Sequence, residues 1–192
     1  MHDRWALAYH VCQTRIDPNG SPWFSWPFLL HPSIYYRVPP VGPGQPFISE
    51  VWNLGNPLIW WVAIPCVLYL AIAAFRDRSL TALLLLIGYA SAWLPFALVP
   101  RGLYLYHMLG AVPYMVLATA FVLARLAHGS LEVAAGKTAV SLRGGYVVAI
   151  YLVAVIGAFA FFYPMWTGAP LSTLDNHQRM WLDLLPITIS WR

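Results

Sequence analysis

Four long apolar stretches constrain this chain more than any other feature of its sequence. Each is about 20 residues long, which is the length that an α-helix needs to cross a bilayer. The stretches are Pro57–Phe75, Leu80–Val99, Leu103–Leu126 and Tyr146–Tyr163, and the one charged side chain among them is Arg125. Only 9% of the 192 residues are charged, whereas a soluble domain has about a quarter. The sequence therefore predicts an all-α integral membrane protein with four transmembrane helices.

The charges between these stretches predict the orientation of the chain. Short loops rich in lysine and arginine face the cytoplasm. Arg76 and Arg78 lie in the first loop, and Lys137 and Arg143 lie in the loop between the third and fourth stretches. We therefore expect a multi-pass protein of the cell membrane with both termini extracytoplasmic. All ten tryptophans fall on the expected outer side or at the outer ends of spans, which favours an elaborate outer surface.

The same pattern divides the chain into three regions. Residues 1–56 are expected to form an extracytoplasmic juxtamembrane segment rich in aromatic residues and proline, in which Ser21–Tyr36 lies along the interface. Residues 57–163 form the four-helix transmembrane domain. Residues 164–192 form an interfacial C-terminal tail on the extracytoplasmic side, where Ser172–Leu185 reads as an amphipathic helix capped by Ser172 or Thr173.

Several classes of function are excluded by composition. The net charge is +4 and there is no run of basic residues, so we expect no nucleic-acid partner. The two cysteines, Cys12 and Cys66, show no metal-binding spacing, and we expect neither a metal nor a cofactor. The acidic residues on the outer side form no pair with the spacing of a general acid and base, so no catalytic residue is assigned to this chain; besides Asp3 they are Asp17, Glu50, Asp175 and Asp183.

Arg101 is the strongest candidate for a binding residue. It follows Pro100 and begins the third apolar stretch, on the side of the membrane where little positive charge is expected. A guanidinium can hold a phosphate through two parallel hydrogen bonds. Tyr104, Tyr106 and His107 follow within two helical turns and are expected to share the site. The alternative is that Arg101 reaches the lipid headgroups and His107 makes a contact between helices.

Asn53 and Asn56 are the second pair of candidates. They stand in the sequence NLGNP just before the first apolar stretch. An asparagine side chain has both donors and acceptors, which suit the hydroxyl groups of a sugar. The alternative is that both residues only cap the first helix.

Three blocks of this sequence resemble the C-terminal four-span region of the protein O-mannosyltransferases, which depend on dolichyl- or polyprenyl-phosphate-mannose. The blocks are SPWFSWPFLLHPSIYY, NLGNPLIWW and RGLYLYHMLGAVPY, and together they cover residues 21–114. The third block departs from the family pattern at Met108, where an aromatic residue is usual, and at Gly110, where proline is usual. Arg101, Tyr106, His107 and Pro113 match it.

The resemblance implies a transferase that moves mannose from polyprenyl-phosphate-mannose to Ser or Thr hydroxyls of exported proteins. In this family the catalytic acids lie in an N-terminal outer loop, so the chain is expected to be a fragment, half of a split gene or a degraded copy. We then expect it to supply part of the donor site beside an N-terminal half that carries the acidic loop, and to be inactive alone. A non-catalytic membrane subunit and a transferase for another sugar or acceptor are the alternatives.

Overall fold

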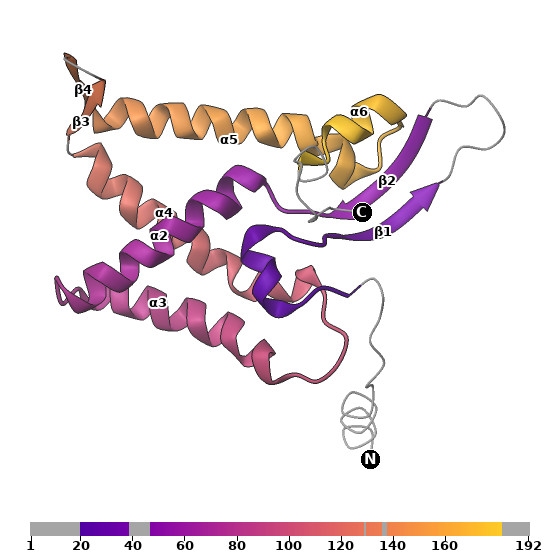
Figure 1. Cartoon of the computed structure of the whole chain (residues 1–192), viewed down its shortest axis with the longest axis horizontal. Coiled ribbons are helices and arrows are strands. Elements are labelled where there is room, and N and C mark those ends of the chain that lie inside the picture. The colour runs from indigo at the N-terminus through magenta and orange to yellow at the C-terminus, as the bar shows by residue number, and fades with distance from the viewer. Residues whose placement is uncertain (1–19, 39–46, 129, 136–137, 182–192) are drawn as a thin grey trace. The chain divides into compact units, whose positions relative to one another are not determined.

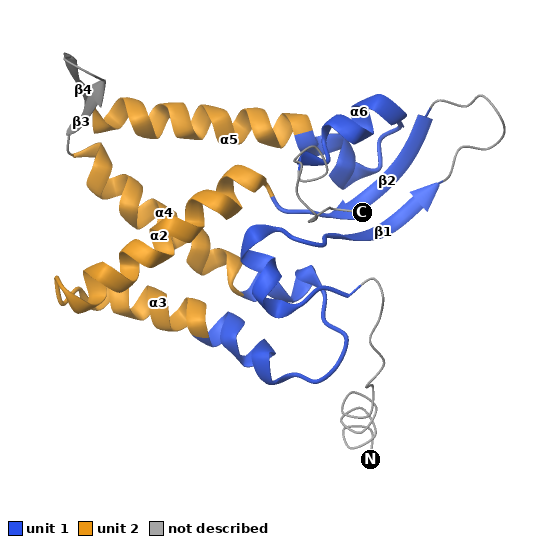
Figure 2. Ribbon diagram, viewed as in Figure 1, with its two compact units in different colours: residues 1–55, 91–110, 162–192 blue, residues 56–90, 111–161 orange. Residues whose placement is uncertain are grey.

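The computed structural model describes residues 20–38, 47–128, 130–135 and 138–181 (Figure 1). The chain forms two compact units (Figure 2). Unit 1 consists of residues 1–55, 91–110 and 162–192, and unit 2 consists of residues 56–90 and 111–161. The expected N-terminal segment and tail helix are therefore described only in part, since residues 1–19, 39–46 and 182–192 lie outside the described ranges.

The first apolar stretch forms helix α2, Pro57–Phe75, with the bounds that the sequence predicts. Asn56 is its N-cap, and its side-chain oxygen accepts a hydrogen bond from the amide of Leu58. Pro57 occupies the first helical position, where the missing N–H of proline costs nothing. The local sequence thus contains the start signal of this helix in full.

The second and third apolar stretches form shorter helices than expected. Helix α3 covers Leu80–Trp93 and continues as the 3-10 helix η2, Leu94–Leu98, which begins beside a proline. Helix α4 covers Val112–Ala127, and so begins nine residues after the expected start at Leu103. Leu105–Gly110 form a separate 3-10 helix, η3. Pro113 accounts for the late start, because proline is tolerated only in the first turn of a helix.

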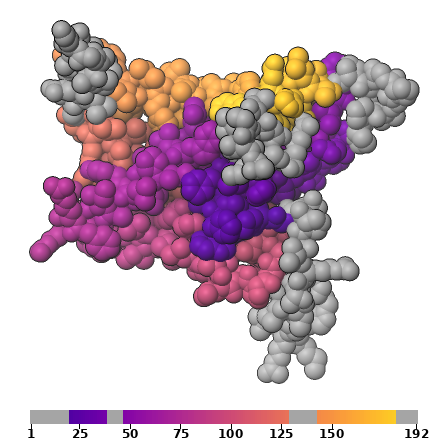
Figure 3. All heavy atoms as spheres, viewed as in Figure 1, coloured from indigo at the N-terminus to yellow at the C-terminus, as the bar shows by residue number. Residues whose placement is uncertain are grey.

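Helix α5 covers Gly144–Thr167 and extends beyond both expected ends of the fourth stretch. Many of its side chains are exposed, including Tyr146, Ile150, Val153 and Ile156. Helix α5 is the orange segment of the space-filling view (Figure 3). Apolar side chains on the outside of a helix of this length are typical of a membrane span.

Three helical stretches in the described ranges are long and apolar enough to cross a membrane. They are Pro57–Phe75, Leu80–Leu98 and Gly144–Thr167. Helix α4 is also apolar but shorter. The prediction of a mostly helical membrane protein is confirmed.

The core of unit 2 lies between α2 and α4. It contains small side chains from α2 and its neighbours, with Leu70 fully buried among them; the others are Cys66, Ala73, Ala74, Ala82 and Ala118. Small residues let helices approach closely within a membrane. Gly88 of α3 shows the same effect, since a Cβ atom built there would overlap the ring of Tyr114 in α4.

Unit 1 contains a small sheet that the sequence reading did not anticipate. Its strands are β1, Ser33–Val38, β2, Phe47–Asn53, and β5, Leu171–Ser172, in the order β1-β2-β5. All neighbours are antiparallel, and the β1–β2 register runs from Ser33 opposite Asn53 to Val38 opposite Ser49. The segment read as purely interfacial therefore ends in a strand. Before it, Trp23–Phe28 form the 3-10 helix η1.

Helix α6 follows β5 and covers Thr173–Gln178. Its cap is Ser172, as predicted, with the hydroxyl accepting from the amide of Asp175 at 3.0 Å. The helix ends earlier than the expected Leu185, because the amides of Arg179 and Met180 make tight turn hydrogen bonds to Asn176 and His177. Elsewhere, β3, Ser130–Ala135, and β4, Thr138–Arg143, pair antiparallel in the loop between α4 and α5.

Candidate functional site

Trp26 is a buried, hydrogen-bonded side chain next to the segment that contains Arg101 and His107. Its side chain is completely buried. Its indole N–H donates to the Ser21 hydroxyl at 2.8 Å, and the Ser21 amide donates to the carbonyl of Leu103 at 2.7 Å. These bonds join η1 to the segment before η3, so that segments far apart in the sequence are held together within unit 1.

Five rings form an aromatic cluster around this point. His107 stacks on Trp26 with ring centroids 5.8 Å apart and on Tyr106 at 4.3 Å, and Tyr104 stacks on Tyr106 at 5.5 Å. Phe96 of η2 packs edge-on against both Trp26 and His107. The structure therefore brings together Tyr104, Tyr106 and His107, as the sequence predicted. It does so by ring stacking at the start of the 3-10 helix η3 and not on one face of an α-helix.

His107 is held in one orientation. Its Nδ1 atom lies 2.9 Å from the carbonyl oxygen of Tyr104 and 3.2 Å from the Tyr104 amide nitrogen.

The charge of this site resides on Arg101. Burial lowers the pKa of His107, the Tyr104 carbonyl opposes that shift, and the nearby Arg101 guanidinium lowers the pKa further. The ring is therefore neutral at pH 7. Arg101 itself is partly exposed and stands in the turn before η3. An anion at this site would be attracted by Arg101, and the aromatic cluster would provide a rigid apolar wall.

Asn53 is the last residue of β2 and also belongs to unit 1. Its Cα partner across the ladder is Ser33, the first residue of β1. The Nδ2 atom of Asn53 and the Oγ atom of Ser33 are both buried and have no hydrogen-bond partner. Ser33 was not among the residues that the sequence singled out, because a lone serine carries no signal until the strand register is known.

Asn56 belongs to unit 2, and its side chain is hydrogen-bonded at both ends, unlike that of Asn53. Its side-chain oxygen accepts from the Leu58 amide at 3.0 Å, and its Nδ2 donates to the carbonyl of Val155 at 3.0 Å. Both ends of the amide are therefore occupied within the protein. This geometry favours the capping role for Asn56, and the donor-binding role remains a prediction.

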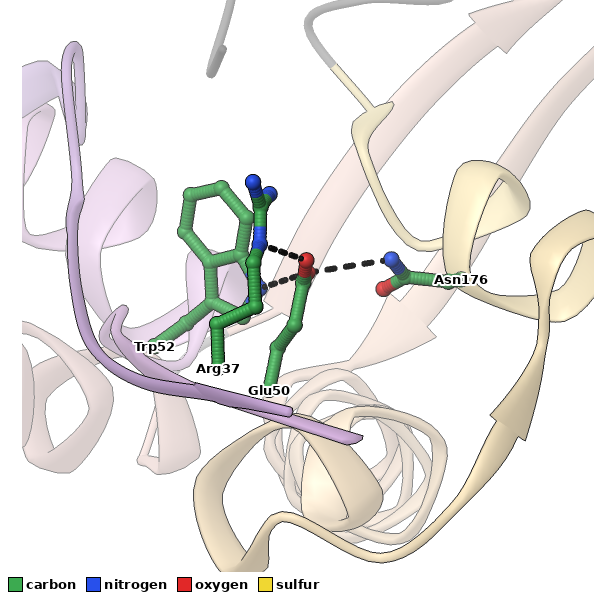
Figure 4. Close-up of polar contacts among 4 residues, drawn as sticks. All are labelled: Arg37, Glu50, Trp52 and Asn176. Carbon is green, nitrogen blue, oxygen red and sulfur yellow. Dashed lines mark hydrogen bonds and ion pairs between the residues drawn. The ribbon is translucent and has the colours of Figure 1, made fainter. Parts of the chain in front are cut away.

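A buried carboxylate, Glu50, connects the sheet with α6 (Figure 4). It is only 4% exposed and accepts from Arg37 Nε at 2.6 Å, Trp52 Nε1 at 2.8 Å and Asn176 Nδ2 at 3.1 Å. The two Nη atoms of Arg37 point away from Glu50 in Figure 4. A carboxylate with its oxygens engaged in this way stabilises structure and is not available as a base. The sequence reading did not find this group, since its partners come from three separate segments.

Known proteins match nearly the whole chain. The family model described as the C-terminal four TMM region of protein-O-mannosyltransferase matches residues 4–185. The chain belongs to the protein O-mannosyltransferase family. The resemblance of the three sequence blocks is thereby confirmed, along with the membrane class of the protein.

Relatives with a curated name support this family assignment. The polyprenol-phosphate-mannose–protein mannosyltransferases of Mycobacterium tuberculosis and Mycolicibacterium smegmatis are each 29% identical to this chain over 97% of its length. The corresponding protein of Corynebacterium glutamicum is 26% identical over 97%. The chain spans about a third of the length of these mannosyltransferases, 35%, 36% and 35% respectively.

The fold also occurs in a solved protein O-mannosyltransferase. The structure of the S. cerevisiae Pmt1-Pmt2 complex bound to the sugar donor matches with a TM-score of 0.66 at 21% identity. The match covers 96% of this chain and 26% of the solved chain. At this level of identity the likeness establishes the fold of this family member.

Proposed function

We propose that this chain is part of a glycosyltransferase that moves mannose from polyprenyl-phosphate-mannose to Ser or Thr of exported proteins. The match of residues 4–185 to the family model carries the proposal. In our scheme the chain supplies part of the donor site: Arg101 beside Tyr104, Tyr106 and His107 for the phosphate end, and Asn53 for the sugar. Asn56 caps α2.

The proposed reaction defines what Arg101 has to do. The acceptor hydroxyl oxygen attacks the anomeric carbon of mannose, the bond from that carbon to the phosphate oxygen breaks, and the polyprenyl phosphate leaves with the electron pair. Negative charge therefore grows on the phosphate as the bond breaks. A guanidinium held near it stabilises this charge in the transition state.

The base that receives the hydroxyl proton is expected outside this chain. Among the described acids outside the β3–β4 hairpin, Glu50 is bound by three donors, Asp77 contacts Arg125, and Asp175 accepts from Ser172. Each is engaged in holding the protein together. From the family resemblance we propose an N-terminal part or partner protein with an acidic outer loop as the source of the base.

Substitution of Arg101 tests this function. We expect Arg101→Ala to reduce mannose transfer by the assembled enzyme at least tenfold at unchanged protein level, and Arg101→Lys to recover only part of it, since lysine lacks the planar two-pronged contact. Arg76→Ala, an exposed arginine of unit 2, is the matched control. Full recovery by lysine would favour contact with lipid headgroups, and normal transfer by the alanine variant would exclude the donor role of Arg101.

We also propose that both termini are extracytoplasmic in the cell membrane. Support comes from the positive charge of Arg76 and Arg78, and from unit 1, which contains the described residues 20–38, 47–55 and 162–181 together with residues 91–110. A membrane-impermeant thiol reagent added to intact cells should label Thr167→Cys and not Arg76→Cys in a background without native cysteines. The reverse labelling would contradict this orientation.

A further inference from the structure

The pair Ser33 and Asn53 has unused hydrogen-bonding capacity at one end of the sheet. The two residues face each other across the β1–β2 ladder, where directly opposed side chains have Cβ atoms about 4.5–5.5 Å apart. Ser33 Oγ and Asn53 Nδ2 are removed from solvent and have no partner. Leaving such groups unpaired is unfavourable, and native structures satisfy most of them with protein, water or a ligand.

The polar side chains three residues away from Asn53 in the sequence have hydrogen-bond partners, unlike this pair. Asn56, three residues later, uses both its acceptor and its donor. Glu50, three residues earlier on the same strand, has three donors. Ser33 Oγ and Asn53 Nδ2 thus differ from the side chains of Glu50 and Asn56, which have their partners within the protein.

We infer that Ser33 and Asn53 together bind one hydroxyl group of the sugar on the lipid donor. This inference rests on the proposed function, and it adds Ser33 as a sugar-contacting residue. A hydroxyl is both donor and acceptor, so its oxygen accepts from Asn53 Nδ2 while it shares a second hydrogen bond with Ser33 Oγ. An apolar lipid tail would leave both atoms unpaired.

A ligand reaches the pair only if the two polar atoms are uncovered. Ser33 and Asn53 are each partly exposed as whole residues, although the two polar atoms are covered. The pair and Arg101 belong to the same compact unit.

The test measures binding of two labelled lipids to the purified full enzyme: polyprenyl-phosphate-mannose and polyprenyl phosphate without sugar. Ser33→Ala and Asn53→Leu should each lower the affinity for the mannose-bearing lipid about three- to tenfold, the effect of one lost hydrogen bond. Affinity for the sugar-free lipid should change less than about twofold by the same reasoning. Ser49→Ala, which lies on the same strand as Asn53, is the control and should leave both affinities unchanged.

A second arm uses the unaltered protein, so that it does not depend on the folding of a variant. Donor lipids that lack single sugar hydroxyls are compared, and one of them should bind more weakly by the same factor. The Asn53→Leu variant should no longer distinguish that lipid from the complete donor.

Each other outcome counts against the inference. Equal binding of the lipids with and without sugar by the unaltered protein, or equal binding of all deoxy donors, overturns it and leaves the proposed function standing. Variants that lose only thermal stability indicate a structural water between the two residues and also overturn it. Binding of neither lipid by the unaltered enzyme overturns both this inference and the proposed function.

Discussion

The Glu50 network makes a quantitative prediction about the stability of unit 1. Trp52 and Asn176 are buried, at 4% and 3% exposure, and each donates to Glu50. Glu50→Ala removes their acceptor, and a buried donor left unpaired costs about 1–3 kcal/mol. Together these two donors predict a loss of about 2–6 kcal/mol in the free energy of unfolding.

Two milder substitutions separate the contributions. Glu50→Gln keeps the volume and one acceptor oxygen, so we expect a loss of about 1–3 kcal/mol. Arg37 is half exposed on its side chain and can turn to water. Arg37→Gln removes the positive partner of a carboxylate side chain that is only 3% exposed. Trp52 and Asn176 still donate to Glu50 in this variant, so we expect a smaller loss than in Glu50→Ala.

The assay is thermal unfolding of the detergent-solubilised protein followed by tryptophan fluorescence, combined with trypsin cleavage after Arg179 just beyond α6. Cleavage should accelerate most in Glu50→Ala, because Asn176 holds α6 to the sheet through Glu50. Wild-type stability and cleavage in Glu50→Ala would refute the reasoning. An equal loss in Arg37→Gln would show that the ion pair with Arg37, and not the two buried donors, dominates.

Three further predictions follow from local geometry. Gly88→Ala should destabilise unit 2 by about 1–3 kcal/mol through overpacking against Tyr114, and adding Tyr114→Leu should restore the melting temperature. The His107 pKa lies below 6.5 in the folded protein, so the unfolded chain binds the proton more readily; melting temperature should fall as pH drops through 6.5, and His107→Gln should flatten that profile. Asn56→Ala should cost about 1 kcal/mol as a lost cap, and transfer should fall only in proportion to protein level.

Membrane helices were the most predictable part of this protein, since their signal is local. The bounds of α2 followed from its apolar length, from Asn56 and from Pro57. The cap of α6 at Ser172 was equally readable. The start of α4 was missed although Pro113 marks it, because the apolar run continues from Leu103 through the 3-10 helix η3 without a charged residue.

The sheet of unit 1 illustrates what a single sequence does not contain. β1 carries a run of exposed residues, Ile34, Tyr35, Tyr36, Arg37 and Val38, without the alternation that marks a half-buried strand. Its partner β2 is recognised as a strand only when it is paired with β1. The third strand, β5, follows α5 in the sequence and is therefore distant from both. Such pairing is a long-range choice, which local propensity reflects only weakly.

The sequence by itself determined the membrane class, the family and the identity of the candidate residues Arg101, Tyr104, Tyr106 and His107, because hydropathy and short motifs are properties of consecutive residues. Tertiary structure decided which polar groups are already satisfied. In the folded protein both ends of the Asn56 amide are hydrogen-bonded, and Glu50 accepts from three donors. Ser33 Oγ and Asn53 Nδ2 have no hydrogen-bond partner. Whether a polar side chain has a partner depends on segments distant in the chain, and this is the physical reason that only the fold could separate capping residues from candidate binding residues.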